Sequence, residues 1–580
     1  MQTDVSLSDA NAKRDHTLRD VLIVLAVGSV LVFPSFFTRD PWNPDEPRYV
    51  EVAREMVVLN DYVTPRLNGV LYPDKPPLFF WLASVFYRIG FGMNSGRFVA
   101  ALANLGTLLL VYFFGCRLLP APGGLLAAVV TATTFLFFGL LKPGVIDPLL
   151  TFLTTVALVA AYHALRGGPR RVTWWLLFYG ACSLGILAKG PVGIIVPAIV
   201  GVVYAAFHRK AVSAGGWAHA AGAVVVLAIV GTWVAGVWHH AGAEYTKEVV
   251  LNKAASYTTE HTSHAHGPHY YFGMLPLYVF PWTFFAALAL AQAFVAWRKR
   301  KDGDAAFLFL WVACILVFFS AITAKRERYL LPLIPAVGLL CARYFVLGMR
   351  DGVPWPKLHR WFSVVTFGSI GLLAVAIAAV PWLVHPWLEK SFADAPDVAV
   401  KLRAVTSPVT IVLVTVAALV LLGAAVAGIR SAVRNASPWA PVLVVLAAMI
   451  IVSLCFDLLA FPLLNPVKSG RAFAVEALPY LKKAHKSYMY GDEYSGVINL
   501  YTGIVSIPAI DGADKAERML AILQREAPSR IAVVTDLGSF KSIRDRLPQG
   551  FHVAVQQQIG HRSMLLFCNW PVPNAQPPAP

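Results

Sequence analysis

Charged and phenolic side chains gather at both ends of the segment 40–77, in a chain that is otherwise strongly apolar. They form two compact clusters: Asp45, Glu46, Arg48 and Tyr49, and then Tyr72, Asp74 and Lys75. Cations and hydroxyls at such spacing can bind an anion and stabilise charge that develops during a reaction. Asp45 precedes Pro47, so it could also cap a helix. A cap does not explain the basic and aromatic neighbours, and we predict a site here.

Three further motifs place charge at the end of an apolar run. They are Lys142–Asp147 before Pro148, Lys189 before Gly190 and Pro191, and the Lys325–Pro332 motif with Arg326, Arg328 and Tyr329. Basic residues at a helix start could hold a phosphate together with the helix amides. Asp147 could cap its own helix or reach a site at the membrane surface.

Histidines are concentrated in the segment EHTSHAHGPH, which contains His261, His264 and His266. Their spacing suits zinc or another divalent metal ion. Histidines in loops are also often simply solvated. The sequence therefore requires no cofactor, and it leaves a divalent metal such as zinc as one possibility.

The composition sets the class of protein that must position these residues. Of 580 residues 57% are hydrophobic and 14% are charged, whereas soluble domains have roughly 25% charged residues. This indicates a polytopic membrane protein. A net charge of +17 would suggest nucleic acid in a soluble chain, but Lys and Arg also collect in the cytoplasmic loops of membrane proteins. We therefore expect membrane lipids as partners and no nucleic acid.

Thirteen apolar runs are long enough to cross roughly 30 Å of hydrocarbon. They begin near Val21, Phe98, Gly123, Pro148, Val172, Val192, Trp217, Tyr271, Ala305, Leu330, Trp361, Pro408 and Trp439. The run Pro76–Gly92 is short and is broken by Arg88, so we predict an interfacial helix there. Thirteen spans then put the basic loops on the side of the N terminus, which we expect to be cytoplasmic.

The same topology predicts that all the charged motifs share the outer face. Six cations there run against the positive-inside bias: Arg48, Lys75, Lys142, Lys325, Arg326 and Arg328. An anionic ligand such as a phosphate would explain them, and binding of lipid headgroups is the alternative.

The predicted fold class is an all-α membrane domain of about thirteen transmembrane helices with additional interfacial helices, followed by a small α/β domain on the outer, periplasmic face. Short alternating strands around helices in the tail favour the α/β assignment. The predicted domains are a cytoplasmic tail at 1–19, a transmembrane catalytic domain at 20–462, the α/β domain at 463–570 and a disordered Pro-rich tail at 571–580.

The motifs together resemble a known enzyme family. N-P-D-E-P-R-Y at 43–49, Y-P-D-K-P-P at 72–77, Asp147-Pro148, Lys189-Gly190-Pro191 and K-R-E-R-Y-L-L-P at 325–332 are similar to those of the bacterial aminoarabinose lipid A transferases. These belong to the GT-C glycosyltransferases that use polyprenyl-phosphate sugars. Many relatives have Glu where this chain has Asp74.

The resemblance implies transfer of 4-amino-4-deoxy-L-arabinose from undecaprenyl phosphate to a lipid A phosphate at the bacterial inner membrane. Resistance to polymyxin and cationic peptides follows from that implication. The candidate carboxylates are Asp45 first, then Asp147 and Asp74; Asp45 would be a base or would contact the sugar's ammonium group. The candidate substrate- and phosphate-binding residues are Lys75, Arg48, Tyr49, Tyr72, Arg326, Arg328, Tyr329 and Lys189.

Two other functions remain open from the sequence. A related GT-C enzyme could move another sugar, such as mannose, to a protein hydroxyl, which would need a true general base. A transporter of polyprenyl lipids is more remote, because such proteins commonly show inverted repeats and buried midplane charges, and neither is plain here.

Overall fold

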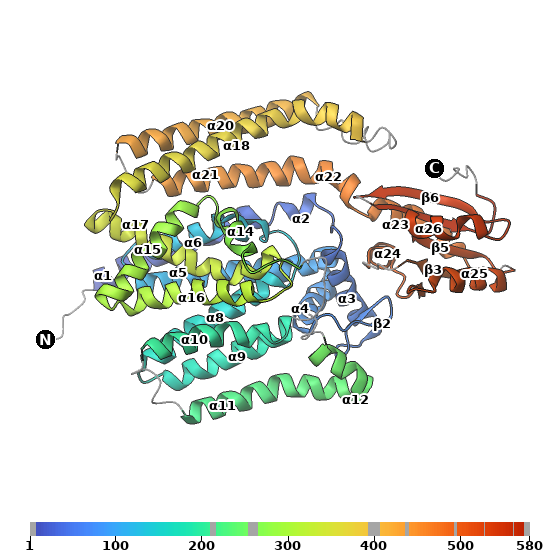
Figure 1. Cartoon of the computed structure of the whole chain (residues 1–580), viewed down its shortest axis with the longest axis horizontal. Helices are drawn as coiled ribbons and strands as arrows, with labels where there is room; N and C mark the ends of the chain where they lie inside the picture. Colours follow the sequence, from blue (N-terminus) through green and yellow to red (C-terminus); the bar gives the residue numbers. More distant parts are fainter. Residues whose placement is uncertain are drawn as a thin grey trace.

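A computed structural model describes residues 7–208, 216–252, 265–391, 407–434, 440–491, 496–526, 528–560 and 562–572. Long helices fill most of it, and a small domain with a sheet lies at one end (Figure 1). α1 begins at the opposite end of the molecule from that domain. The expectation of a polytopic helical protein with a small C-terminal α/β part is confirmed.

The described residues contain ten helical stretches that are long and apolar enough to cross a membrane, and a pair bent by 111° would make eleven. Two shorter apolar helices, Gly123–Thr133 and Val192–Phe207, accompany them. Twelve of the thirteen predicted starts fall inside these helices, and the remaining one, Trp439, lies outside the described residues, just before α21. The eleven spans and the thirteen predicted ones differ by α6 and α10. These two helices are too short to count as spans by themselves.

The main helices of the helical body have the following bounds: α1 (Leu7–Val32), α5 (Ser95–Leu118), α6 (Gly123–Thr133), α8 (Asp147–Arg166), α9 (Arg171–Lys189), α10 (Val192–Phe207), α11 (Gly216–Val226), α12 (Thr232–Lys247), α14 (Tyr270–Val279), α15 (Thr283–Arg300), α16 (Gly303–Ala321), α17 (Ile334–Asp351), α18 (Pro356–Ser391), α20 (Pro408–Arg434), α21 (Ala440–Cys455) and α22 (Phe461–Lys468). Short helices connect them: α2 (Ser35–Thr38), α3 (Asp45–Leu59), α4 (Leu78–Phe86), α7 (Phe135–Gly139) and the 3-10 helix η6 (Glu327–Leu333).

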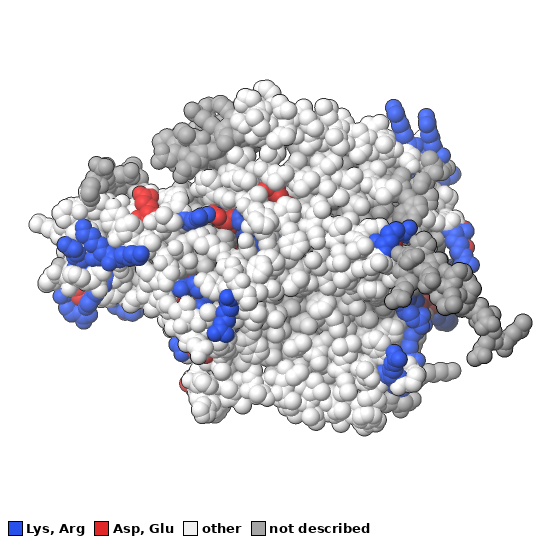
Figure 2. Space-filling view, turned by 180° about the vertical axis from the view of Figure 1, so that it is seen from behind, with Lys and Arg blue, Asp and Glu red and all other residues white. Residues whose placement is uncertain are grey.

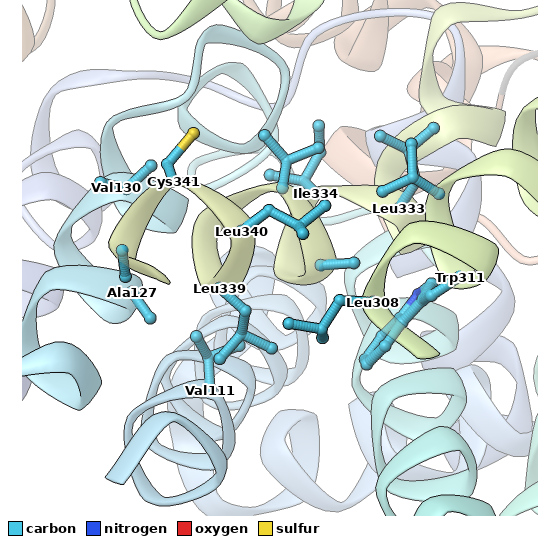
Figure 3. Close-up of a cluster of buried hydrophobic side chains, with 14 of the residues drawn as sticks. Val111, Ala127, Val130, Leu308, Trp311, Leu333, Ile334, Leu339, Leu340 and Cys341 are labelled. Atoms are coloured by element: carbon cyan, nitrogen blue, oxygen red, sulfur yellow. The ribbon is translucent and has the colours of Figure 1, made fainter. Parts of the chain in front are cut away.

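Helix α17 lies at the centre of the helical body. Its apolar side chains pack against α5, α6 and α16, as Leu339, Leu340 and Cys341 do in Figure 3. A Cβ on Gly338 would lie 2.0 Å from the hydroxyl of Thr131 on α6, so a small residue lets the two helices approach closely. The segment η6–α17 and helix α8 are the most enclosed spans, with 89% and 83% of their apolar windows buried. Both begin at the same end of the body, and both begin with residues of the predicted site.

The loop between α1 and α5 forms a compact unit at that end. α3 is followed by a two-residue hairpin, β1 (Arg66–Leu67) and β2 (Val70–Leu71), and then by α4. α4 has nine residues, about half of what a span requires, and it ends in a π-helical turn that includes Gly90 at φ 100°. The interfacial position predicted for 76–92 stays a prediction.

The C-terminal part is a five-stranded mixed sheet with helices packed against it. Its strand order is β4-β3-β5-β7-β6, parallel between β4, β3 and β5 and antiparallel for β7 and β6. The elements are α23 (Arg471–Lys483), β3 (Lys486–Tyr490), α24 (Val497–Thr502), β4 (Ala509–Ile510), α25 (Lys515–Glu526), β5 (Ile531–Asp536), α26 (Leu537–Ile543), β6 (His552–Ile559) and β7 (Arg562–Cys568).

Lys and Arg side chains lie mainly at the two ends of the molecule, and the face shown in Figure 2 has a nearly uncharged band between them. One charged end belongs to the C-terminal part and the other to the end where α1 begins. An uncharged band between charged ends is what a hydrocarbon layer requires of the surface that it touches.

Candidate active site

Asp45 is the first residue of α3, and its carboxylate forms an ion pair with Arg328, which is 283 residues away in the sequence. Arg328 Nη1 on η6 donates to Asp45 Oδ2 at 2.7 Å, and the same nitrogen lies 3.8 Å from Asp147 Oδ2 at the start of α8. The Asp45 side chain is 12% exposed and that of Asp147 is 6% exposed. Arg328 therefore lies between the two leading candidate carboxylates.

Lys189 extends this row of alternating charges. It is the last residue of α9, it pairs with Asp147 Oδ1, and its Nζ lies 4.6 Å from the centre of the Tyr329 ring. The row Asp45–Arg328–Asp147–Lys189 joins the ends of α3, η6, α8 and α9. The sequence suggested these residues one motif at a time, and the structure brings them together.

Arg48 lies one helical turn after Asp45 and faces the second cluster. It interacts with the hydroxyl of the buried Tyr72, and its Nε has no hydrogen-bond partner among the described residues. Burial raises the pKa of Tyr72, and the nearby Asp74 carboxylate adds to the effect. Tyr72 therefore stays a neutral hydrogen-bonding group that links Arg48 to the Tyr72–Lys75 turn.

Tyr49 is placed by packing as much as by charge. Its ring meets those of Phe79 and Phe80 on α4 edge to face, at 5.7 and 5.8 Å. Burial raises the pKa of its hydroxyl, with Asp45 as the next contributor. Tyr49 thus anchors the first turn of α3 on α4 while its hydroxyl stays neutral near Asp45.

The charges around Asp45 keep it ionised. Burial raises the pKa of its carboxyl, but Arg328, Arg48 and Arg326 outweigh burial, so the pKa lies below its ordinary value. A carboxylate with a depressed pKa accepts a proton poorly. It is well suited to hold a cation in place or to balance positive charge.

The candidate site as a whole has more cations than carboxylates. Asp45, Asp147 and Asp74 lie among a larger set of basic residues: Arg48, Lys75, Lys189, Arg326 and Arg328. Lys75 and Asp74 are half-buried in the turn before α4. Glu327, whose carboxylate lies 4.0 Å from Arg328 Nε, brings the count to five cations against four carboxylates. A phosphate can neutralise the excess positive charge.

Two cations that were predicted to lie on the outer face and to bind an anionic ligand, Lys142 and Lys325, have intramolecular partners instead. Lys142 Nζ lies 2.6 Å from Asp457 Oδ2 and donates to Ser453 Oγ and Leu31 O, each at 2.9 Å. Lys325 Nζ donates to Ser320 O at 2.9 Å and thereby caps the end of α16. Lys142 and Lys325 depart from the positive-inside bias because they hold the fold together. For these two residues the prediction of an anionic ligand was wrong.

Arg326 contributes to the site in a different way from Arg328. Its backbone N–H donates to the Tyr271 hydroxyl at 3.0 Å, and that hydroxyl donates to Arg326 O at 2.8 Å. Its guanidinium acts on Asp45 through its charge. These two hydrogen bonds to Tyr271 fix the backbone just before η6, which contains Arg328.

Glu46 is a structural residue that the sequence grouped with Asp45. Its carboxylate accepts from Arg97 Nε at 3.1 Å and from the backbone N–H of Gly144 at 2.9 Å, and it pairs with Arg39. Arg39 and Arg97 were missed from the sequence, where each is one basic residue near a span end. Glu46 joins α3, α5 and the 142–147 loop, and so fixes the two segments that present Asp45 and Asp147.

The predicted histidine metal site falls largely outside the described residues, since these exclude His261 and His264. The His266 ring stacks on Tyr270 with their centres 4.3 Å apart, and the backbone N–H of His266 donates to Thr323 O. Within the residues described, no three His, Cys, Asp or Glu side chains form a group that could hold a metal ion. Metal binding stays a prediction.

Comparison with known proteins places this geometry in context. A model of the dolichyl-phosphate-mannose-protein mannosyltransferase family matches residues 74–235. The undecaprenyl phosphate-alpha-4-amino-4-deoxy-L-arabinose arabinosyl transferase of Pseudomonas aeruginosa PAO1 is 29% identical over 375 residues. The enzyme of the same name from Aeromonas salmonicida is 29% identical over 359 residues, 59% of this chain and 62% of that enzyme. The match to the Pseudomonas enzyme covers 62% of this chain and about 65% of that enzyme's length.

Solved structures extend the similarity over nearly the whole chain. The crystal structure of ArnT from Cupriavidus metallidurans bound to undecaprenyl phosphate matches with a TM-score of 0.74 and 20% identity, and covers 97% of this chain and 99% of that one. The archaeal oligosaccharyltransferase AglB from Archaeoglobus fulgidus matches with a TM-score of 0.52 and 12% identity, and covers 90% of this chain and 70% of that one. These findings confirm the resemblance predicted from the motifs, and they show a multi-pass membrane protein with the GT-C fold of the aminoarabinose transferases.

Proposed function

We propose that this protein transfers 4-amino-4-deoxy-L-arabinose from undecaprenyl phosphate to a phosphate group of lipid A. The observation that carries the proposal is the row Asp45–Arg328–Asp147–Lys189, with Arg48 beside Asp45, in a fold shared with an enzyme crystallised with undecaprenyl phosphate. Its excess of cations at the end of apolar helices suits two lipids that each carry a phosphate.

The chemistry asks mainly for charge placement. A polyprenyl phosphate is already a good leaving group, so the site must hold two anions close together and stabilise the charge that grows on the departing phosphate. We assign this to Lys75, Arg48, Arg326 and Arg328, with Tyr49, Tyr72 and Tyr329 as hydrogen-bond donors. Lys189 orients Asp147 through their ion pair.

Asp45 is better suited to binding the sugar's ammonium group than to acting as a base. Its depressed pKa makes it a weak proton acceptor, and an acceptor phosphate ionised at neutral pH needs little help in losing a proton. Of the two roles considered from the sequence, the surroundings of Asp45 favour this one.

We further propose that the protein resides in the bacterial inner membrane with its N terminus in the cytoplasm. The site and the C-terminal part then lie in the periplasm. Support comes from the basic loops predicted on the side of the N terminus and from the two charged ends of the molecule (Figure 2).

Mass spectrometry of lipid A tests the proposal. Cells that express the protein should gain lipid A species heavier by one pentosamine per modified phosphate, and cells that lack it should not. An Asp45→Ala or Lys75→Ala variant should insert and fold normally without adding the sugar. Normal modification by both variants would exclude this site.

A second candidate is transfer of a sugar such as mannose to protein, which the match of residues 74–235 to the mannosyltransferase family favours. A hydroxyl acceptor would require a general base. Sugar on periplasmic proteins with unchanged lipid A would support this second function and contradict the first.

A divalent metal at His261, His264 and His266 remains a separate proposal. Metal analysis of the purified protein and of a His261→Ala, His264→Ala double variant tests it. Zinc bound in a one-to-one ratio and lost in the variant would support the site, and equal metal contents would contradict it.

A further inference from the structure

The C-terminal part contacts the membrane domain at the loop that contains half of the candidate active site. The segment 496–507, which comprises α24 and the loop after it, packs against α3 and against the turn of the β1–β2 hairpin. α3 begins with Asp45, and the hairpin leads directly into Tyr72–Lys75. One small contact area therefore reaches both clusters that the sequence singled out.

The hairpin turn is first tied to α3 by a buried carboxylate. Glu55 accepts hydrogen bonds from the backbone N–H groups of Asn68 and Gly69, at 2.6 and 2.9 Å. Asn68 and Gly69 both have positive φ, 60° and 75°, which turns both N–H groups to the same side. Asn tolerates this conformation better than most residues.

Asn68 then binds the C-terminal part through its side chain. Its Nδ2 donates to Ile507 O at 2.6 Å, and its Oδ1 accepts from Ile507 N at 2.6 Å and from Asn499 Nδ2 at 2.9 Å. Asn68 is 4% exposed and Asn499 is fully buried. The Asn68 amide thus pairs with both backbone polar groups of one residue, Ile507, as a residue of a neighbouring β-strand would.

A second contact lies beside the first on α3. Arg54 donates to both carboxylate oxygens of Glu51, at 2.7 and 2.8 Å, and also to the carbonyls of Gly503 and Ile504 at the end of α24. Gly496 lies so close to α3 that a Cβ would be 3.2 Å from Glu51 Cβ, and its φ of 74° also favours glycine.

Such an interface fixes position more strictly than an apolar one. Hydrogen bonds are directional, and buried polar groups must all be satisfied at once. α3 is a rigid rod that rises about 1.5 Å per residue, so holding Glu51 and Glu55 also holds Asp45 and Arg48. The hairpin continues into Tyr72, whose N–H donates to Pro65 O at 2.8 Å and whose hydroxyl meets Arg48.

We propose that the C-terminal part serves as a positioning element of the active site, and that Asn499, acting through Asn68, sets the Tyr72–Lys75 turn against Asp45 and Arg48. This inference rests on the proposed function for its catalytic consequence. The mechanical part, order in residues 61–75, does not depend on the identity of the substrates.

The test uses the full-length protein in lipid nanodiscs. Asn499→Ala and Asn68→Ala are compared with the wild type and with Gln524→Ala, an exposed side chain on α25 that makes none of these contacts. Hydrogen exchange of residues 61–75 should accelerate in both Asn variants and stay unchanged in Gln524→Ala. The Asn68→Ala, Asn499→Ala double variant should lose less exchange protection than the sum of the two single losses, because the two residues share a hydrogen bond.

Aminoarabinose transfer to lipid A supplies the second readout. We expect kcat to fall about a hundredfold, as misplacement by about 1 Å can cause, while KM for the donor changes far less. Asn68→Asp keeps the oxygen that accepts from Asn499 and Ile507 and should recover part of kcat. Wild-type kcat per folded molecule in both Ala variants, or unchanged exchange in 61–75, would overturn the inference. An inactive wild type with the exchange pattern intact would count against the proposed function alone.

Discussion

Arg328 has three acidic neighbours, Asp45, Asp147 and Glu327, and is the central cation of the candidate site. Substituting it by Ala removes the positive charge that lies 2.7 Å from Asp45 and 3.8 Å from Asp147. We expect transfer to fall by about a hundredfold or more, the usual cost of losing one preorganised donor. Steady-state kinetics on the purified variant measure this, with Arg350→Ala, 74% exposed, as the matched control.

The same variant should change the pH dependence of the reaction. In the wild type Arg328 helps to hold the pKa of Asp45 below its ordinary value, so activity is kept as the pH falls until that low pKa is reached. In the variant, burial still raises the pKa of Asp45 but Arg328 no longer lowers it. The pKa of Asp45 therefore rises, and the acid limb of the pH profile moves to higher pH. An unchanged limb would contradict the assignment of Asp45.

Glu51 should make stability depend on pH. Burial raises its pKa from 4.5 to about 7, even though Arg54 opposes the shift. The folded protein thus binds this proton more tightly than the unfolded chain does, and the stabilisation is present below about 4.5 and lost as the pH rises towards 7. Thermal unfolding followed from pH 5 to 8 should show this slope, and Glu51→Gln should flatten it. Parallel curves for the two proteins would exclude Glu51 as its source.

Among the connecting elements, the loop before α8 contains Lys142, a cation that the sequence associated with an anionic ligand and that pairs with Asp457 instead. The Lys142–Asp457 pair is buried and ties the loop before α8 to the last membrane helices. Lys142→Ala leaves an unpaired buried carboxylate and should destabilise the protein by about 3–5 kcal/mol. Replacing both residues with Met and Leu should cost less.

Thermal stability and kcat per folded molecule separate the two possible roles of Lys142. Our assignment predicts that Lys142→Ala loses stability while kcat is preserved. A stable Lys142→Ala protein that no longer transfers sugar would contradict this assignment and would place Lys142 in the active site.

Helix α3 shows how far an element can be predicted from sequence. The spacing of Val50, Ala53 and Met56 predicts a helix with an apolar face, and all three are buried. An amphipathic helix on the membrane surface, as the sequence predicts here, would expose its polar face to water, whereas Glu51 and Glu55 are buried beneath the C-terminal part. Periodicity reports which face is apolar, and it does not report that a distant segment covers the polar one.

The candidate site was predictable where local motifs had unusual charge. Asp45, Arg48, Asp147, Lys189 and Arg328 each stood beside a proline, a glycine or a helix end in the sequence. Which of them would pair was not predictable, because the pairs join residues as far apart as Asp45 and Arg328. The same limit hid the structural pairs of Lys142 and Glu46.

At the scale of the whole molecule, hydropathy located the helices well, because apolar length is the property that a bilayer selects. The orientation can be tested by labelling. Asp351→Cys, at the end of α17, and Gln524→Cys, on α25, are both exposed positions. In intact cells with a permeable outer membrane, a membrane-impermeant maleimide should label residue 524 and leave residue 351 unlabelled. The parent for both is Cys116→Ser, which removes an exposed native cysteine; the reverse pattern would invert the proposed topology.

The hydrogen bond between Asn68 and Asn499 joins residues 431 positions apart, and this separation links the site to the order of synthesis. A ribosome completes the hairpin long before it reaches α24. A chain interrupted after η6 but before α24 contains every residue that we assign to chemistry, yet it lacks the contacts that align the Tyr72–Lys75 turn with α3. The active site should therefore become able to react with lipids only after the C-terminal part has been synthesised and has folded. An unfinished protein in the membrane would be harmless to the pool of lipid-linked sugar.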